Sequence, residues 1–180
     1  LLRGLQLGRP SLSRWSPALI MTMSGLAVEP LAWLQSLLIR RQLRARQLPP
    51  DPIVVIGHWR SGTTYLHQLL ASDPAAATVR NSLMVAPQVA VLLRSLIVLL
   101  LARLMSARRP IDPVAWGPED PQEDELCIAK LILDTNMVGV AFPLDYLIHF
   151  RRSVLLTTRR FERLWLNITR LTWLHDGAGR

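Results

Sequence analysis

A β-branched run that stops at a glycine and passes into a hydroxyl-rich loop constrains this chain more than any other feature. Residues 53–56 read Ile-Val-Val-Ile, Gly57 follows, and residues 61–64 read Ser-Gly-Thr-Thr. Residues 65–70 then place apolar side chains at helical spacing. Strand, glycine-rich loop and helix in this order predict a P-loop-type turn, in which backbone N–H groups at a helix N-terminus surround a phosphate.

The loop differs from a nucleotide triphosphatase loop in its cation. The spacing Gly57-x-x-x-x-Gly62 fits the usual motif, but position 63 is Thr where that motif has the Lys that contacts the β- and γ-phosphates. The cation of this loop is an arginine, three residues earlier. The pattern favours a phosphate ligand over ATP, and a P-loop kinase or nucleotide triphosphatase stays as the alternative enzyme. The predicted phosphate-binding residues are Arg60, Ser61, Gly62, Thr63 and Thr64.

Two sequence blocks resemble the sulfotransferase family. Residues 59–65, W-R-S-G-T-T-Y, resemble the P-K-S-G-T-T-W loop of cytosolic sulfotransferases and the P-R-S-G-T-T loop of bacterial and tyrosylprotein sulfotransferases. Residues 109–112, R-P-I-D, and 117–125, G-P-E-D-P-Q-E-D-E, resemble the R-P-M-D … G-P-x-x-P-Q-E-D-E block of the bacterial branch. Ala141-Phe142-Pro143 resembles that branch's A-F-P. The resemblance extends from about Pro49 to the C-terminus.

The resemblance implies an activity and a fold. Members of the family transfer a sulfuryl group from 3′-phosphoadenosine 5′-phosphosulfate (PAPS) to a hydroxyl or amine acceptor by in-line displacement, without a metal. In such a reaction, the Arg60 guanidinium would bridge oxygens of the leaving phosphate. The implied fold is α/β, a three-layer P-loop fold with a parallel sheet, present here only in part and helix-rich. Small-molecule, glycan, lipid, phenol and peptide acceptors all remain open.

The general base cannot be carried over from the family directly. The tyrosylprotein branch has a catalytic Glu about twenty residues beyond its loop arginine, and this position falls near Asn81 here. Glu123, in the resembled Q-E-D-E block, is the leading replacement, because a carboxylate in an apolar pocket can gain a useful pKa. His67, one helical turn from Thr63, is the other, and His58 could face the ligand. The competing interpretation is that the acids of this block only stabilise a helix N-terminus.

Further residues of the second block could shape the acceptor pocket. Arg109 and Asp112 could organise it or form a salt bridge that fixes the loop, and Trp116 could stack on an acceptor or fill the core. His149 and His175 have no metal-ligand spacing with other His, Cys or acidic residues, so zinc chemistry is unsupported.

The chain divides at Pro49 into two predicted parts. Residues 1–48 form a basic segment without periodicity to residue 17 and an amphipathic helix over 26–48, and residues 49–180 form the N-terminal part of a sulfotransferase P-loop domain. The continuous apolar run 53–56 predicts a strand covered on both faces. Since the family's 3′-phosphate site follows a later strand, we expect an incomplete and inactive fragment. The other predicted elements are helices over 61–72, 122–133 and 159–174, a strand over 78–80 and a loop over 110–121.

Residues 85–105 form the most apolar stretch of the chain and raise the question of a membrane span. Arg94 lies in its middle and Arg103 near its end, and a central Arg costs about 2.5–3.5 kcal/mol on insertion scales. A buried or interfacial helix is therefore favoured over a transmembrane one. A non-catalytic, membrane-associated helical protein is the alternative from outside the enzyme classes, and peripheral membrane contact is compatible with the enzyme too.

Composition sets the remaining limits. The chain has 180 residues, 50% of them hydrophobic, which suffices for one domain with a buried core. Its net charge of +8 comes almost wholly from Arg, since Lys130 is the only lysine, and it suits anionic ligands. The basic stretch lacks interleaved aromatics, so nucleic acid is disfavoured. The single Cys127 excludes an intrachain disulfide and predicts a cytoplasmic location; oligomeric state is open.

Overall fold

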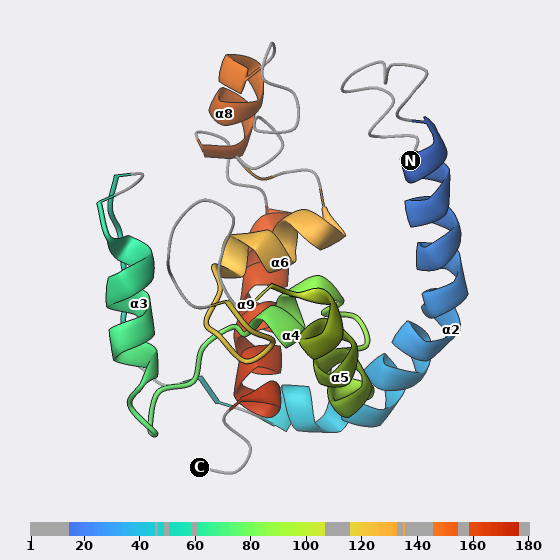
Figure 1. Ribbon diagram of the computed structural model, residues 1–180, viewed down its shortest axis with the longest axis horizontal. Helices are drawn as coiled ribbons and strands as arrows, with labels where there is room; N and C mark the ends of the chain where they lie inside the picture. The colour runs from blue at the N-terminus through green and yellow to red at the C-terminus, as the bar shows by residue number, and fades with distance from the viewer. Residues whose placement is uncertain are drawn as a thin grey trace.

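The computed structural model describes residues 15–45, 47–48, 51–58, 61–106, 116–132, 135, 146–154 and 159–176. Helices dominate these ranges (Figure 1). Their bounds are α2 Trp15–Ala45, α3 Thr63–Ala71, α4 Asn81–Val85, α5 Arg94–Leu104, α6 Asp124–Leu131, α8 Tyr146–Val154 and α9 Arg159–His175.

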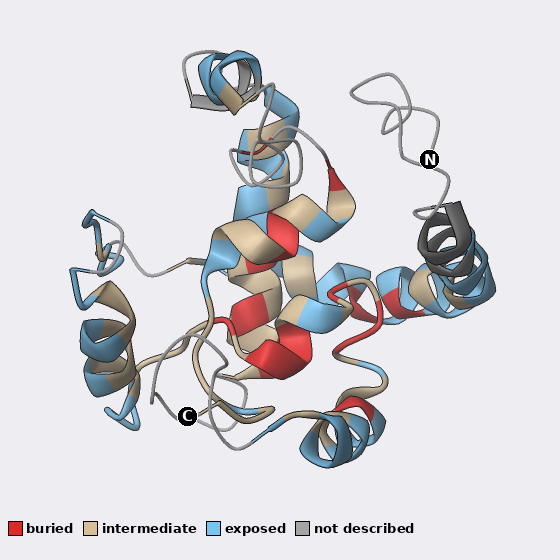
Figure 2. Cartoon of the chain, turned by 45° about the horizontal axis from the view of Figure 1, so that its top comes forward, coloured by how far each residue is buried: buried red, intermediate tan, exposed pale blue. Residues whose placement is uncertain are grey.

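The hydrophobic core lies where α4, α6 and α9 meet, with α5 packed beside α4 (Figures 1 and 2). Leu83, Ile128 and Ile168, one from each of the three central helices, are at most 1% exposed. Burial of side chains of this size contributes about 1.5–3 kcal/mol each. The packing of these residues brings α9 against α6.

Helix α2 wraps around the core and is fixed to it by one buried polar side chain. The Gln35 amide nitrogen donates to the Pro87 carbonyl oxygen over 3.1 Å, and its amide oxygen accepts the N–H groups of Val91 and Leu92, each over 2.9 Å. Because these two N–H groups bond to Gln35, and Pro87 has none, the apolar stretch 85–105 does not form one helix. Its helical part is α5, preceded by turns.

The predicted strand and sheet are not formed in the described part of the chain. Residues 53–56 are extended without a ladder, and Ile53, Val54 and Ile56 are 76%, 62% and 88% exposed rather than covered on both faces. The expected strand over 78–80 is reduced to an isolated antiparallel bridge between Arg80 and Pro121. An apolar strand needs partner strands to bury its faces, and none lies among the residues described. The fold observed is helix-rich, and the parallel sheet remains a proposal.

Most predicted helices are present with shifted ends. The predicted helices 61–72, 122–133 and 159–174 correspond to α3, α6 and α9, whereas α4 and α8 were not predicted. The helix expected over 26–48 begins at Trp15 and ends at Ala45, so residues 15–17 are helical and not aperiodic. Pro30 lies inside it, where local helix geometry alone would disfavour it. Within the described ranges, no helix combines the length and apolarity that a bilayer span requires.

Candidate functional site

The described residues on the two sides of the loop, 57–58 and 61–64, lie close together. A Cβ atom built on Gly57 would lie 2.5 Å from Thr63 Cγ2 and 2.8 Å from Ser61 Oγ. A side chain at position 57 would therefore require the Thr63 and Ser61 side chains to move. The Ser61 backbone N–H and hydroxyl both donate to the His58 carbonyl oxygen, over 3.2 and 2.6 Å. These hydrogen bonds hold Ser61 against His58 on either side of residues 59 and 60.

Gly62 turns this loop into α3. Its φ of 88° is left-handed, a conformation that glycine adopts without steric cost. The Leu66 N–H donates to the Gly62 carbonyl oxygen over 3.0 Å, which closes the first helical turn. This turn has no acidic residue and no side-chain cap, so its amide dipoles favour an anionic partner.

The structure places the predicted loop residues at the start of one helix. Ser61 and Gly62 are exposed, and Thr63 and Thr64 are half-buried. Arg60 lies outside the described residues, as do Arg109 and Asp112, so their predicted roles are not tested. His58 is exposed, and the side chain of His149 lies outside the description.

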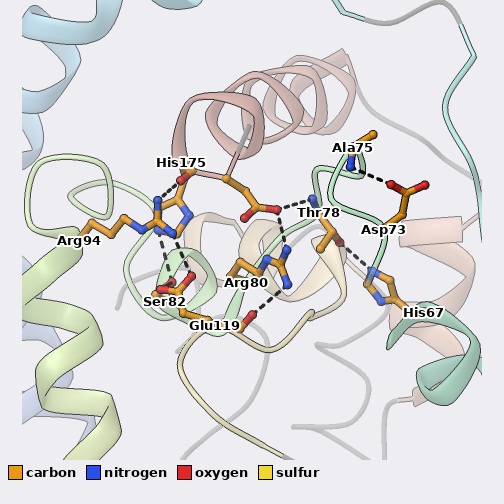
Figure 3. Close-up of polar contacts among 10 residues, drawn as sticks. His67, Asp73, Ala75, Thr78, Arg80, Ser82, Arg94, Glu119 and His175 are labelled. Atoms are coloured by element: carbon orange, nitrogen blue, oxygen red, sulfur yellow. Dashed lines mark hydrogen bonds and ion pairs between the residues drawn. The ribbon is translucent and has the colours of Figure 1, made fainter. Parts of the chain in front are cut away.

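His67 links α3 to the segment that enters α4. Its Nε2 lies 2.7 Å from Thr78 Oγ1, and the ring points toward Thr78 (Figure 3). Burial lowers the pKa of His67 below its ordinary 6.5; the nearby carboxylates of Asp124 and Glu123 oppose this shift, and Arg80 reinforces it. The two candidate bases, His67 and Glu123, therefore lie within electrostatic reach of each other. A half-buried imidazole with a lowered pKa is neutral at pH 7 and able to accept a proton.

The second sequence block lies alongside the segment that enters α4. Three backbone hydrogen bonds and one from the Arg80 side chain to a backbone oxygen join residues 79–82 to residues 118–122, and they hold the acidic block, residues 117–125, to the core. They run from Gln122 N–H to Val79 O over 2.8 Å, from Asn81 N–H to Asp120 O over 3.1 Å, from Ser82 N–H to Pro118 O over 2.8 Å and from Arg80 Nη1 to Glu119 O over 3.0 Å.

Asn81, where the tyrosylprotein branch would have its Glu, is a buried bridge. Its side-chain nitrogen donates to the Gly117 carbonyl oxygen over 2.8 Å, and its oxygen accepts from Gln122 Nε2 over 3.0 Å. The Gln122 oxygen in turn accepts the Glu123 backbone N–H over 3.0 Å. Asn81 therefore fixes both ends of the G-P-E-D-P-Q run and, through Gln122, the backbone of Glu123.

The acids at the start of α6 have different surroundings. Glu123 is the exposed residue that precedes the helix, whereas Asp124 and Glu125 lie in its first turn, where negative charge stabilises the helix. The Asp124 carboxylate also accepts a hydrogen bond from the Trp165 indole over 2.5 Å. This arrangement supports the interpretation that two of the three acids are structural and leaves Glu123 open to solvent, outside the apolar pocket expected for it.

The sequence analysis did not predict a polar cluster that joins the entry of α4, the start of α5 and the end of α9 (Figure 3). Arg80 forms an ion pair with Asp176 over 3.0 Å, with both side chains largely buried, and the Arg94 guanidinium pairs with Glu119 over 2.9 Å and donates to the His175 carbonyl oxygen. Arg94 thus joins α5, the acidic block and the end of α9. Its position within an apolar run was the one available signal, since a charge that is removed from water usually has a charged or hydrogen-bonded partner.

His175 and Cys127 are buried within this framework. The His175 Nε2 lies 3.3 Å from Ser82 Oγ, and its Nδ1 has no hydrogen-bond partner. Burial, reinforced by Arg94, lowers the pKa of His175 to about 4. Burial raises the pKa of the Cys127 thiol to about 12, so this thiol is unreactive and packs as a small apolar group. No group of His, Cys and acidic residues suited to a metal is found in the described ranges.

Comparison with known proteins shows which family the chain resembles. Residues 52–133 match the sulfotransferase family and include both the loop and the acidic block. This segment of the chain is similar to members of the sulfotransferase family. Two relatives are the omega-hydroxy-beta-dihydromenaquinone-9 sulfotransferases of Mycobacterium bovis and Mycobacterium tuberculosis, each 30% identical over 131 residues, or 73% of this chain. The match spans 34% of each relative. No solved structure matches the chain.

Proposed function

We propose that this sulfotransferase segment binds PAPS and transfers its sulfuryl group to a hydroxyl on an apolar, lipid-like acceptor. The observation that carries the proposal is that one family match, over residues 52–133, spans both motifs. In the structure, His67 of the helix after the loop contacts Thr78, and residues 79–82 are hydrogen-bonded to the second motif. The name of the mycobacterial relatives, a sulfotransferase of a hydroxylated menaquinone, supports a lipid-like acceptor here.

The proposed reaction divides its tasks between the two motifs. The acceptor oxygen attacks sulfur, the new S–O bond forms as the bond to the phosphate oxygen breaks, and the acceptor proton passes to a base. Amide groups at the start of α3 and the Arg60 guanidinium would stabilise the charge that develops on the leaving phosphate. Glu123 or His67 would accept the proton. His67 has the stronger environmental support, because its pKa is lowered and its ring is held by Thr78.

We also propose that the full catalytic unit is larger than the helical core. The chain spans about a third of the length of its mycobacterial relatives. In support, the apolar face of α3 is open, with Tyr65, Leu66 and Leu69 exposed by 62%, 48% and 53%. A parallel sheet that includes residues 53–56 would bury the faces of that strand, and it would also cover the exposed apolar side chains of α3. The proposed location is the cytoplasm, consistent with one unpaired, buried Cys127.

Ligand-dependent thermal stability tests the donor site. The product nucleotide 3′-phosphoadenosine 5′-phosphate at 100 times its Kd should stabilise the protein by about 2.7 kcal/mol, which corresponds to roughly 5–10 °C in Tm. Arg60→Ala should remove most of this shift, whereas Arg160→Ala, at an exposed position of α9, should leave it unchanged. Stabilisation by ATP with Mg²⁺ but not by the bisphosphate would favour a P-loop kinase instead.

Radiolabelled PAPS tests the transfer and the base in the complete catalytic unit, because the 180-residue chain alone is expected to be inactive. A long-chain apolar alcohol should accept label where a soluble sugar does not. If His67 is the base, His67→Gln should lower kcat by about 10²–10⁴-fold and Glu123→Gln should leave it nearly unchanged. The rate should then fall when the pH drops through the pKa of His67, which lies below the ordinary histidine value of 6.5. The reverse pattern of the two variants would assign the base to Glu123.

A further inference from the structure

Helix α2 has a defined inner side that packs on the core. Val28, Ala32, Gln35 and Ile39 recur every three or four residues; Gln35 and Ile39 are 3% and 8% exposed, and Val28 and Ala32 contact the core cluster. The three hydrogen bonds of Gln35 fix the rotation of the helix about its axis. The opposite side of α2 therefore faces away from the molecule (Figure 2).

This outer side is apolar, unlike the outer side of an ordinary surface helix. Met23, Leu26, Trp33 and Leu37 are exposed by 64%, 63%, 67% and 54%. Leu34 and Leu38 flank them and are also exposed. With Pro30, these four residues follow one another at intervals of three or four, so they form one continuous row, which we call the outer stripe of α2.

The stripe leads into a basic end. Arg41 and Arg44 continue it at the same spacing, Arg40 lies beside them, and all three are exposed. The only acid of α2 is Glu29, on its flank. Apolar side chains with Trp on one surface, joined to a cluster of arginines, match the composition of helices that lie in a membrane interface.

We propose that the outer stripe of α2, with Arg40, Arg41 and Arg44, docks the protein peripherally on an anionic lipid surface. Charge complementarity selects this occupant: the chain has a net charge of +8, and anionic headgroups neutralise the arginines while Trp33 and Leu37 enter the boundary with the acyl chains. A second copy of the chain would offer these arginines no acidic partner on the same stripe. The docking surface is independent of sulfuryl transfer and can be tested without PAPS.

Vesicle flotation tests the proposal. The protein should float with vesicles of phosphatidylglycerol mixed with phosphatidylcholine and remain below with phosphatidylcholine alone. Each Arg near the surface contributes about fivefold to partitioning, so Arg41→Gln with Arg44→Gln should lower it roughly 25-fold. Trp33→Ser with Leu37→Ser should lower it at least tenfold. The matched control is Arg159→Gln with Arg160→Gln, which changes the net charge equally at exposed positions of α9 and should have little effect.

Site-specific fluorescence tests which side of α2 meets the lipid. An environment-sensitive dye on Leu37→Cys should shift to shorter wavelength on anionic vesicles, whereas the same dye on Gln42→Cys, exposed but off the stripe, should not. Equal shifts at both positions, or an equal loss of binding in the α9 control, would overturn the proposal. So would a lipid-free dimer, seen by sedimentation velocity, that Trp33→Ser with Leu37→Ser dissolves, because the stripe would then be an interface between copies.

Discussion

Gly57 is the residue on which the geometry of the proposed donor loop depends most directly. An added methyl group would overlap Thr63 Cγ2 at 2.5 Å and Ser61 Oγ at 2.8 Å, so Gly57→Ala must displace these two side chains of the loop. We expect affinity for 3′-phosphoadenosine 5′-phosphate, measured by calorimetry, to fall roughly tenfold or more, about 1.4 kcal/mol. Gly25→Ala is the control: no atom lies within 4 Å of its added Cβ, and it should stabilise α2 by about 0.5–1 kcal/mol. Unchanged affinity in Gly57→Ala would place the nucleotide elsewhere.

His175 gives stability a specific pH dependence. Its pKa is lowered from 6.5 to about 4 by burial and by Arg94, against the opposing charges of Glu119 and Asp176, with Arg80 adding a smaller lowering effect. In the unfolded chain, His175 binds a proton as the pH drops below about 6.5. In the folded chain it stays neutral until about pH 4. The free energy of unfolding is therefore highest above pH 6.5 and decreases toward pH 4. The loss amounts to about 3 kcal/mol.

Urea unfolding at a series of pH values measures this effect. His175→Gln should flatten the dependence between pH 6.5 and 4, and His58→Gln, at an exposed position, should not. If the wild-type chain and His175→Gln lose stability in parallel over this range, carboxylates alone cause the loss.

At the scale of elements, the entry into α4 and the acidic block before α6 behave as one unit held by Asn81. Asn81→Ala would leave the Gly117 carbonyl group and the Gln122 amide without their partner, at about 1–3 kcal/mol for each buried group. We expect a matching loss of unfolding free energy and faster hydrogen exchange in residues 117–123. Asn167→Ala, on the exposed side of α9, should change neither. Protection of 117–123 that survives Asn81→Ala would mean that the backbone hydrogen bonds suffice.

Sequence patterns predicted those elements whose cause is local. The apolar spacing from Phe161 to Trp173 predicted α9 nearly to the residue, since the helix was expected over 159–174 and spans Arg159–His175. The prediction of one helix over 85–105 was wrong because a residue far away in the sequence determines the structure there. The Gln35 side-chain oxygen accepts hydrogen bonds from the N–H groups of Val91 and Leu92. The loop glycines were recognisable from spacing, but the role of Asn81 depends on partners that no local pattern reveals.

At the scale of the whole molecule, an exposed β-branched run beside a well-packed helical core indicates a fold that needs further strands. Ile56 is 88% exposed in the chain described here. If residues 53–56 form a central strand in the complete catalytic unit, as we propose, the same side chain is buried there. Ile56→Asn should then leave the free energy of unfolding of the 180-residue chain within about 0.5 kcal/mol. It should destabilise the larger unit by about 1.5–3 kcal/mol.

This difference can be measured by joining the chain to the part of the Mycobacterium tuberculosis relative that lies outside the matched region, and unfolding both proteins in urea. Leu83→Ala is the control: Leu83 is 0% exposed in the helical core, so the variant should lose about 2–5 kcal/mol in either context. A cost of Ile56→Asn that is the same in both proteins would show that the strand gains no cover from the added chain. Residues 53–56 would then not be a strand of a parallel sheet. The helices alone would have to support the donor loop.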